Sequence, residues 1–176
     1  MLNVLDHLRA VARPEPLRAV HMMKPDVPGS DQPNELVDFP IVIRLPIQWG
    51  DQDAFGHVNN TVPIRWLESS RIAYFEQGNR PLMLDSHKMG PILASIGCNY
   101  RRQLHFPDTV RIGARVSRLG RSSLTMEHVV YSETQQAIAA DGSSVIVVFD
   151  YETNRPIRIS DEIRSAIEQF EGKSFA

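Results

Sequence analysis

The chain has 176 residues, of which 42% are hydrophobic and 23% are charged, as expected of a globular protein rather than a disordered one. A formal net charge of −2 gives no electrostatic reason to expect nucleic acid or an anionic membrane as a partner. Cys98 is the only cysteine, which excludes an internal disulfide and a cysteine-based zinc cluster and suits a reducing compartment. The strongest apolar run, Val145 to Phe149, is far shorter than the roughly 20 residues that cross a bilayer. We therefore expect a cytoplasmic protein.

The first 38 residues differ in composition from the rest of the chain. Prolines recur through them, and the stretch VPGSDQPN (27–34) is typical of a linker. We predict an N-terminal arm over residues 1–38 and one folded domain over residues 39–176. Within the arm, four residues have the spacing of an apolar helical stripe: Leu2, Leu5, Leu8 and Val11.

The domain begins with a strand pattern, IVIRLPIQW (41–49), followed by a loop rich in short polar residues, DQDAFGHVNN (51–60). A helix is expected from about Asn60 to Gln77, with Gly78 as its terminator. Apolar residues occupy most of the circumference of this helix, which indicates that other structure wraps around it.

Strand patterns dominate after Pro91. TVRIGARVS (109–117) and SLTMEHVVY (123–131) alternate apolar and polar residues, and AIAADGSSVIVVFDY (137–151) is rich in β-branched residues. Asp141–Gly142 leaves two interpretations open, a hairpin turn or one long strand with an interior glycine. Ser160 is the expected N-cap of a short helix that ends near Phe170. This order predicts an α+β fold in which a curved antiparallel sheet wraps around a long helix.

The stretch WGDQDAFGHVNNTVPIRWLESSRIAYFE (49–76) resembles the hotdog-fold acyl-CoA thioesterases of the 4-hydroxybenzoyl-CoA thioesterase-like superfamily. Its loop is similar to their Asp-x-x-Gly-His-Val-Asn-Asn motif. The later stretches LHFPDTVRIGARVSRLGRSSLTMEHVVY and RPIRISDEIRSAIEQF are also similar, so the resemblance covers about residues 40–170. It implies a hotdog fold and favours the single long strand at Gly142. Pro63 departs from the pattern, because the family usually carries an aromatic residue there.

Hydrolysis of a thioester needs a nucleophile or an activated water, and it needs donors for the charge that develops on the carbonyl oxygen. By the resemblance, Asp53 matches the catalytic aspartate, either as nucleophile or as general base. Unpaired backbone N–H groups of Asn60 and Thr61, at the start of the helix, would polarise the carbonyl.

Further candidates each have a structural alternative. Glu68 is the alternative catalytic carboxylate, and its structural alternative is an ion pair with Arg71 three residues later. His57 and Asn59 either contact substrate or shape the loop. The turn at Arg121, Ser122 and Ser123 resembles the CoA-contacting segment of the family. Six histidines without paired ligand spacing give no reason to expect a metal site.

These observations predict an acyl-CoA thioesterase that needs no cofactor, because CoA is part of its substrate. A lone curved sheet would leave an edge and an apolar face open, so a homodimer or homotetramer is expected. Two other functions stay open. One is a hotdog dehydratase or hydratase, suggested by HFPD at His105, and the other is a non-catalytic module that binds acyl-CoA or acyl carrier protein.

Overall fold

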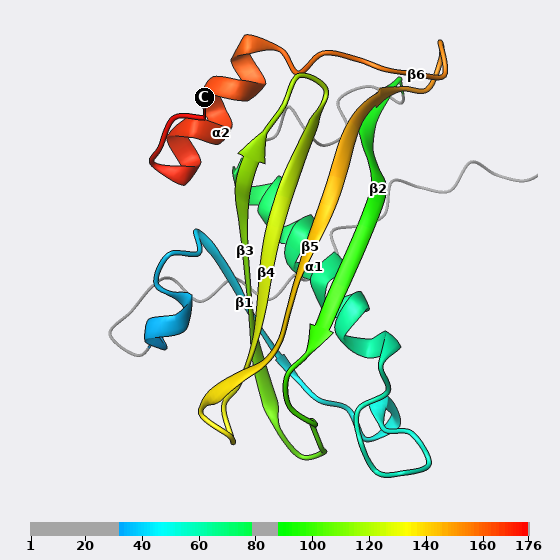
Figure 1. Ribbon diagram of the computed structural model, residues 1–176, viewed down its shortest axis with the longest axis vertical. Helices are drawn as coiled ribbons and strands as arrows, with labels where there is room; N and C mark the ends of the chain where they lie inside the picture. The colour runs from blue at the N-terminus through cyan, green and yellow to red at the C-terminus, as the bar shows by residue number, and fades with distance from the viewer. Residues whose placement is uncertain (1–31, 79–87, 176) are drawn as a thin grey trace, which may run out of the picture.

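The fold is seen in a computed structural model, which describes residues 32–78 and 88–175 (Figure 1). The apolar stripe expected between Leu2 and Val11 lies outside these ranges. Within these ranges the elements follow in this order: η2 (Asn34–Leu36), β1 (Ile41–Pro46), η3 (Trp49–Asp51), α1 (Thr61–Gly78), β2 (Met89–Tyr100), β3 (Thr109–Leu119), β4 (Ser123–Ser132), β5 (Ala137–Asp150), β6 (Arg155–Pro156) and α2 (Asp161–Glu171). None of the helices in the described ranges is long and apolar enough to cross a membrane.

The main strands form one antiparallel sheet in the order β1-β3-β4-β5-β2, and the short β6 pairs with β5. The sheet curves around α1, which lies along its inner face (Figure 1). This arrangement confirms the α+β hotdog prediction. β5 runs unbroken from Ala137 to Asp150, so Asp141–Gly142 is strand interior and no hairpin forms there.

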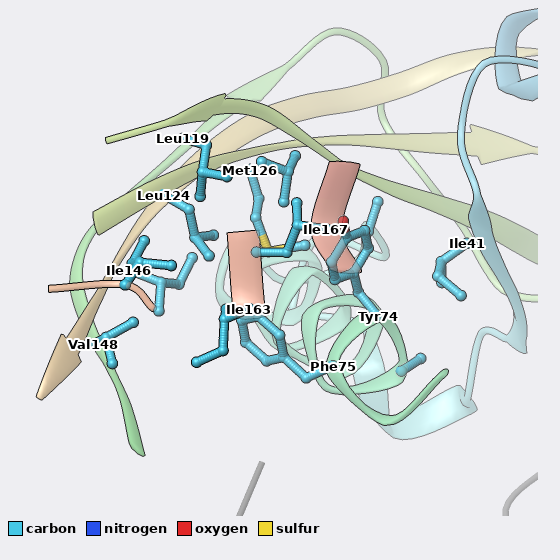
Figure 2. Close-up of a cluster of buried hydrophobic side chains, with 14 residues drawn as sticks. Ile41, Tyr74, Phe75, Leu119, Leu124, Met126, Ile146, Val148, Ile163 and Ile167 are labelled. Atoms are coloured by element: carbon cyan, nitrogen blue, oxygen red, sulfur yellow. The ribbon is translucent and has the colours of Figure 1, made fainter. Parts of the chain in front are cut away.

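Alternation along the strands places the core between the sheet and the two helices. On β4, every second residue from Leu124 to Val130 is buried and faces α1. Figure 2 shows the part of this core in which strand residues such as Leu124 and Met126 surround Tyr74 of α1 and Ile163 of α2. α2 begins as predicted, because the Ser160 side chain accepts the Ile163 N–H at 3.2 Å.

A polar chain crosses this core between α1 and the sheet. The Ser70 hydroxyl donates to the Leu67 carbonyl at 2.9 Å and therefore has only lone pairs left for His128 Nδ1 at 3.1 Å. His128 thus carries its proton on Nδ1, and Nε2 accepts from the Ser144 hydroxyl at 2.9 Å. These hydrogen bonds satisfy both ring nitrogens of an imidazole that is only 1% exposed.

Residues just before β1 cover part of the outer face of the sheet. Leu36 is fully buried, and Phe39 lies so close to β3 that a Cβ on Gly113 would approach the Phe39 ring to 2.7 Å. The end of the predicted arm therefore packs on the domain through Leu36.

Candidate active site

The polar loop is tied to α1 through Asp51. One carboxylate oxygen of Asp51 lies 3.1 Å from the Arg65 guanidinium on α1, and the other accepts the Gln48 N–H at 2.8 Å. The backbone carbonyl of Asp51 accepts the Asn59 N–H at 2.8 Å. Asp51 therefore fixes both ends of the loop against the start of the helix.

Asp53 is oriented by a tight turn within this loop. Its Oδ1 accepts the backbone N–H of Phe55 at 2.8 Å and that of His57 at 3.3 Å. Gly56 closes the turn at φ = 79°, a left-handed conformation in which glycine has no steric penalty. In the part of the chain that the structure describes, Oδ2 has no hydrogen-bond partner. One oxygen of Asp53 therefore shapes the loop, and the other is available for chemistry.

The start of α1 differs in part from the prediction. Asn59 caps the helix, because its Oδ1 accepts both the Thr61 N–H at 3.0 Å and the Thr61 hydroxyl at 2.9 Å. The Thr61 N–H is thus not free, contrary to the prediction, because the asparagine side chain already satisfies it. Among the described residues, the Asn60 N–H has no acceptor. It is the donor that remains available at this end of the helix.

Asp53 and Asn60 line the same cavity, which has a volume of about 300 Å³. Val58, Pro63 and Leu104 form apolar parts of the wall. The wall is completed by His57, Tyr100, Arg101, Arg102, Gln103, Ala139 and Ala140. The cavity is therefore lined by the residue with the free carboxylate oxygen and by the residue with the unpaired backbone N–H, beside apolar surface. Such a space can orient a thioester and stabilise charge on its carbonyl oxygen.

Sequence reasoning missed Tyr100 as a wall residue. Tyr100 is the last residue of β2, and its hydroxyl donates to the Asn60 carbonyl at 2.5 Å. Pairing with Ala140 of β5 puts Tyr100 at the cavity, and that register joins segments 40 residues apart. The strand pattern of β2 alone gives no sign of this contact.

Two arginines at the end of β2 differ in their partners. Arg101 forms an ion pair with Asp141 on β5. Arg102 is exposed and, within the described ranges, has no carboxylate partner. The cavity wall therefore carries one cationic side chain that is free to meet an anionic or polar ligand group.

His57 reaches the cavity from the loop. Its ring packs edge-on against that of His105, with centroids 4.9 Å apart, and His105 Nδ1 lies 2.9 Å from the Gly56 carbonyl oxygen. The two imidazoles brace the turn that carries Asp53.

Other predicted site residues lie outside the cavity. Glu68 is exposed and forms a loose pair with Arg71 at 3.8 Å, about 12 Å along α1 from Asn60. Arg121, Ser122 and Ser123 lie in the β3–β4 turn near α2, at the opposite end of the sheet from the polar loop (Figure 1). Within residues 32–78 and 88–175, no cluster of three His, Cys, Asp or Glu side chains could hold a metal ion.

The sequence profile of the thioesterase-like superfamily matches residues 47–167, a span that holds the polar loop, α1 and the sheet from β2 onwards. The chain belongs to this superfamily. The match agrees with the geometry, since the thioesterase-like region includes every residue that lines the cavity.

Named relatives are similar to this thioesterase-like protein over most of their length. A thioesterase from Thermus thermophilus, crystallised with coenzyme A and Zn, is 34% identical with a TM-score of 0.67, and the match covers 78% of this chain and 98% of that one. The long-chain acyl-CoA thioesterase FadM of Escherichia coli is 26% identical over 117 residues, which are 66% of this chain and 89% of FadM. YsmA of Bacillus subtilis, an uncharacterised protein, is 28% identical over 124 residues, 70% of this chain and 82% of YsmA.

Proposed function

We propose that this protein hydrolyses acyl-CoA thioesters to a free acid and CoA, without a retained cofactor. The observation that carries the proposal is that Asp53, with one unpaired carboxylate oxygen, and Asn60, with an unpaired N–H among the described residues, line the same cavity. The names of two relatives, a CoA-bound thioesterase and a long-chain acyl-CoA thioesterase, support CoA as the carrier. The single free thiol, Cys98, suits a cytoplasmic location.

As a general base, Asp53 Oδ2 would accept a proton from water while the water oxygen bonds to the thioester carbon. The carbonyl electron pair moves onto oxygen, and the Asn60 N–H stabilises the resulting oxyanion. Collapse of this intermediate breaks the C–S bond, and the proton held by Asp53 passes to the departing sulfur. The products are the free acid and CoA.

As a nucleophile, Asp53 would itself attack the thioester carbon, expel CoA and form a mixed anhydride that water then hydrolyses. The two routes differ in where solvent oxygen can go. After many turnovers in H₂¹⁸O, mass spectrometry of the peptide that contains Asp53 should find label in its carboxylate only if an anhydride forms. Label confined to the free acid would exclude attack of water on the Asp53 carbon of an anhydride.

The proposal is tested with a panel of acyl-CoAs and detection of the released thiol. Asp53→Asn keeps the shape of the side chain but removes its basicity, so hydrolysis should fall about 10²–10⁴-fold. Asp161→Asn makes the same change on an exposed carboxylate of α2 and should leave hydrolysis unchanged. Glu68→Gln tests the alternative carboxylate. Hydrolysis that persists in Asp53→Asn but is lost in Glu68→Gln would move the chemistry to Glu68, and a wild type that cleaves no thioester would favour a binding module.

We further propose that the active form is a homodimer or homotetramer. β2 is an edge strand of the sheet, and its exposed Leu93 lies on the side that faces α1. On α1, Ile64 and Ile72 are also partly exposed and lie on one stripe of the helix. A second copy that pairs along β2 would cover the open edge and these apolar side chains. Light scattering of the purified protein should give a mass of two or four chains, and a monomer would contradict the proposal.

A further inference from the structure

Tyr100 links the sheet to the start of α1, and both Tyr100 and Asn60 line the cavity. It is the last residue of β2 and 51% exposed, so it contributes little to the hydrophobic core. Its hydroxyl nevertheless donates to the backbone carbonyl of Asn60 at 2.5 Å instead of facing water alone. Burial raises the pKa of Tyr100 above its ordinary value, so the phenol remains a neutral donor near neutral pH.

The carbonyl that Tyr100 binds belongs to the residue that supplies the free donor. Two peptide groups flank the Cα of Asn60, and both are held. The carbonyl of the first, from Asn59, accepts the Val62 N–H at 2.9 Å. The second is held at both ends, because its oxygen accepts from Tyr100 and its N–H, that of Thr61, donates to the Asn59 side chain. The direction of the Asn60 N–H is therefore fixed by contacts on either side.

A donor stabilises a developing oxyanion best when its direction is set before the reaction, because no free energy is then needed to reorient it. Of the contacts that set the direction of the Asn60 N–H, those from Asn59 and Val62 come from the helix start itself. The Tyr100 contact comes instead from β2, a strand of the sheet that also lines the cavity. This contact fixes the position of Asn60, and with it the Asn60 N–H, relative to the sheet.

We propose that Tyr100 is a positioning residue for the hydrolysis, holding Asn60 so that its N–H points at the thioester oxygen. This inference rests on the proposed function. Tyr100 itself does not accept or donate a proton in the reaction. Its effect acts through Asn60 and is therefore expected in the chemical step and not in the affinity for the acyl-CoA.

The test is Tyr100→Phe, which removes the hydroxyl and keeps the ring. Misplacement of a reacting or stabilising group by about 1 Å can cost up to 10²-fold in rate, so kcat should fall about 10- to 100-fold. KM should change less than about twofold, because an interaction made only in the transition state does not alter substrate binding. A merely structural role would instead change both constants or the melting temperature.

Tyr151→Phe is the matched control. Tyr151 is 50% exposed and its hydroxyl lies 3.5 Å from a backbone carbonyl oxygen, that of Pro91, but it does not line the cavity. This variant should keep the wild-type kcat. A Tyr100→Phe enzyme with wild-type kcat, or a loss equal to that of Tyr151→Phe, would overturn the inference while leaving the proposed function intact.

A second measurement does not depend on activity. In ¹⁵N-labelled protein, the amide resonances of Asn60 and Thr61 should shift in Tyr100→Phe, whereas those in the middle of β4 should not. Unchanged Asn60 and Thr61 resonances would show that the hydroxyl does not hold this peptide. If the wild type cleaves no thioester, the proposed function fails and the catalytic role of Tyr100 fails with it, whatever the resonances show.

Discussion

The Tyr74 hydroxyl of α1 donates to the Glu171 carboxylate of α2 at 2.7 Å, and the same Glu171 oxygen accepts the Val116 N–H of β3 at 2.5 Å. Val116 lies at a shift in the register between β3 and β4. One carboxylate therefore joins both helices to an irregular point of the sheet. Burial, and then the neighbouring Glu171, raises the pKa of Tyr74 well above its ordinary value.

Removal of this contact should destabilise the fold without affecting the active site. Tyr74 is only 1% exposed, so Tyr74→Phe leaves a carboxylate with one partner fewer in a partly buried place. We expect a loss of about 1–3 kcal/mol in the free energy of unfolding, measured by urea denaturation. A double-mutant cycle with Glu171→Gln should give a coupling of at least about 0.5 kcal/mol, and additive effects would contradict a direct interaction.

The stability of the protein should depend on pH through His128. Burial, and then the charge of Arg71, lowers the pKa of His128 to about 3. An unfolded histidine binds its proton near pH 6.5, so between pH 6.5 and pH 3 the unfolded state holds a proton that the folded state lacks. The contribution of the neutral His128 to the free energy of unfolding should therefore be complete above pH 6.5. It should fall by up to about 1.4 kcal/mol per pH unit as the pH is lowered through this window.

His128→Gln keeps a polar side chain at this position but does not titrate. Its unfolding free energy should be lower than that of the wild type at pH 7 but should vary less between pH 6.5 and pH 4.5. Glu133, whose pKa is lowered to about 2 chiefly by its hydrogen bond with Arg44, contributes only below about pH 4.5 and does not interfere in this interval. Equal slopes for the two proteins would exclude His128 as the cause.

The parts of the fold that the sequence predicts are those that depend on local pattern. The alternation of β4 and the Ser160 cap are both present, because each reflects one face of an element or one turn of backbone. α1 is wrapped less fully than predicted, because the face that holds Ile64, Glu68 and Ile72 is exposed. The family resemblance supplied the choice between a hairpin and a single strand at Gly142, which the residues alone left open.

Only the part of the candidate site that lies within one stretch of sequence was predictable. The short polar residues around Asp53 indicate a tight turn before a helix, and the structure contains it. The prediction of a free Thr61 N–H was wrong, because the Asn59 side chain accepts this N–H and removes it as a donor. Tyr100 could not be found, because its contact depends on the register of β2 against β5.

Gly142 should be needed for the close approach of α1 to the sheet. A Cβ at this position would lie 2.9 Å from the Leu67 side chain and would also meet the Gly97 carbonyl of β2. Gly142→Ala should therefore cost about 1–3 kcal/mol in unfolding free energy, as overpacked cores do. Gly97→Ala on the neighbouring strand is the control, because a Cβ there meets nothing within 4 Å. Equal stability of the two variants would mean that α1 adjusts without cost.

Activity should be recoverable by pairing two defective chains. The polar loop between β1 and α1, which holds Asp53, and the β3–β4 turn, which holds Arg121, lie at opposite ends of the sheet (Figure 1). One chain therefore does not bring both residues to one cavity. The prediction supposes a two-fold dimer in which the β3–β4 turn of one copy serves the cavity of the other. Arg121→Ala should then raise KM for acyl-CoA about tenfold or more, through loss of a charged hydrogen bond to a phosphate.

Refolding Asp53→Asn together with Arg121→Ala produces hybrid dimers in which one of the two sites has both native residues. Random pairing makes half of the dimers hybrid, so at low acyl-CoA the mixture should regain about a quarter of the wild-type rate if sites form between two-fold-related copies. Refolding each variant alone is the control and should give no gain. A mixture that reaches only the mean of its two parents would mean that Arg121 does not serve the cavity of a partner copy. The CoA phosphates would then have to be held by residues nearer the cavity, among which Arg102 is a cation without a carboxylate partner in the described ranges.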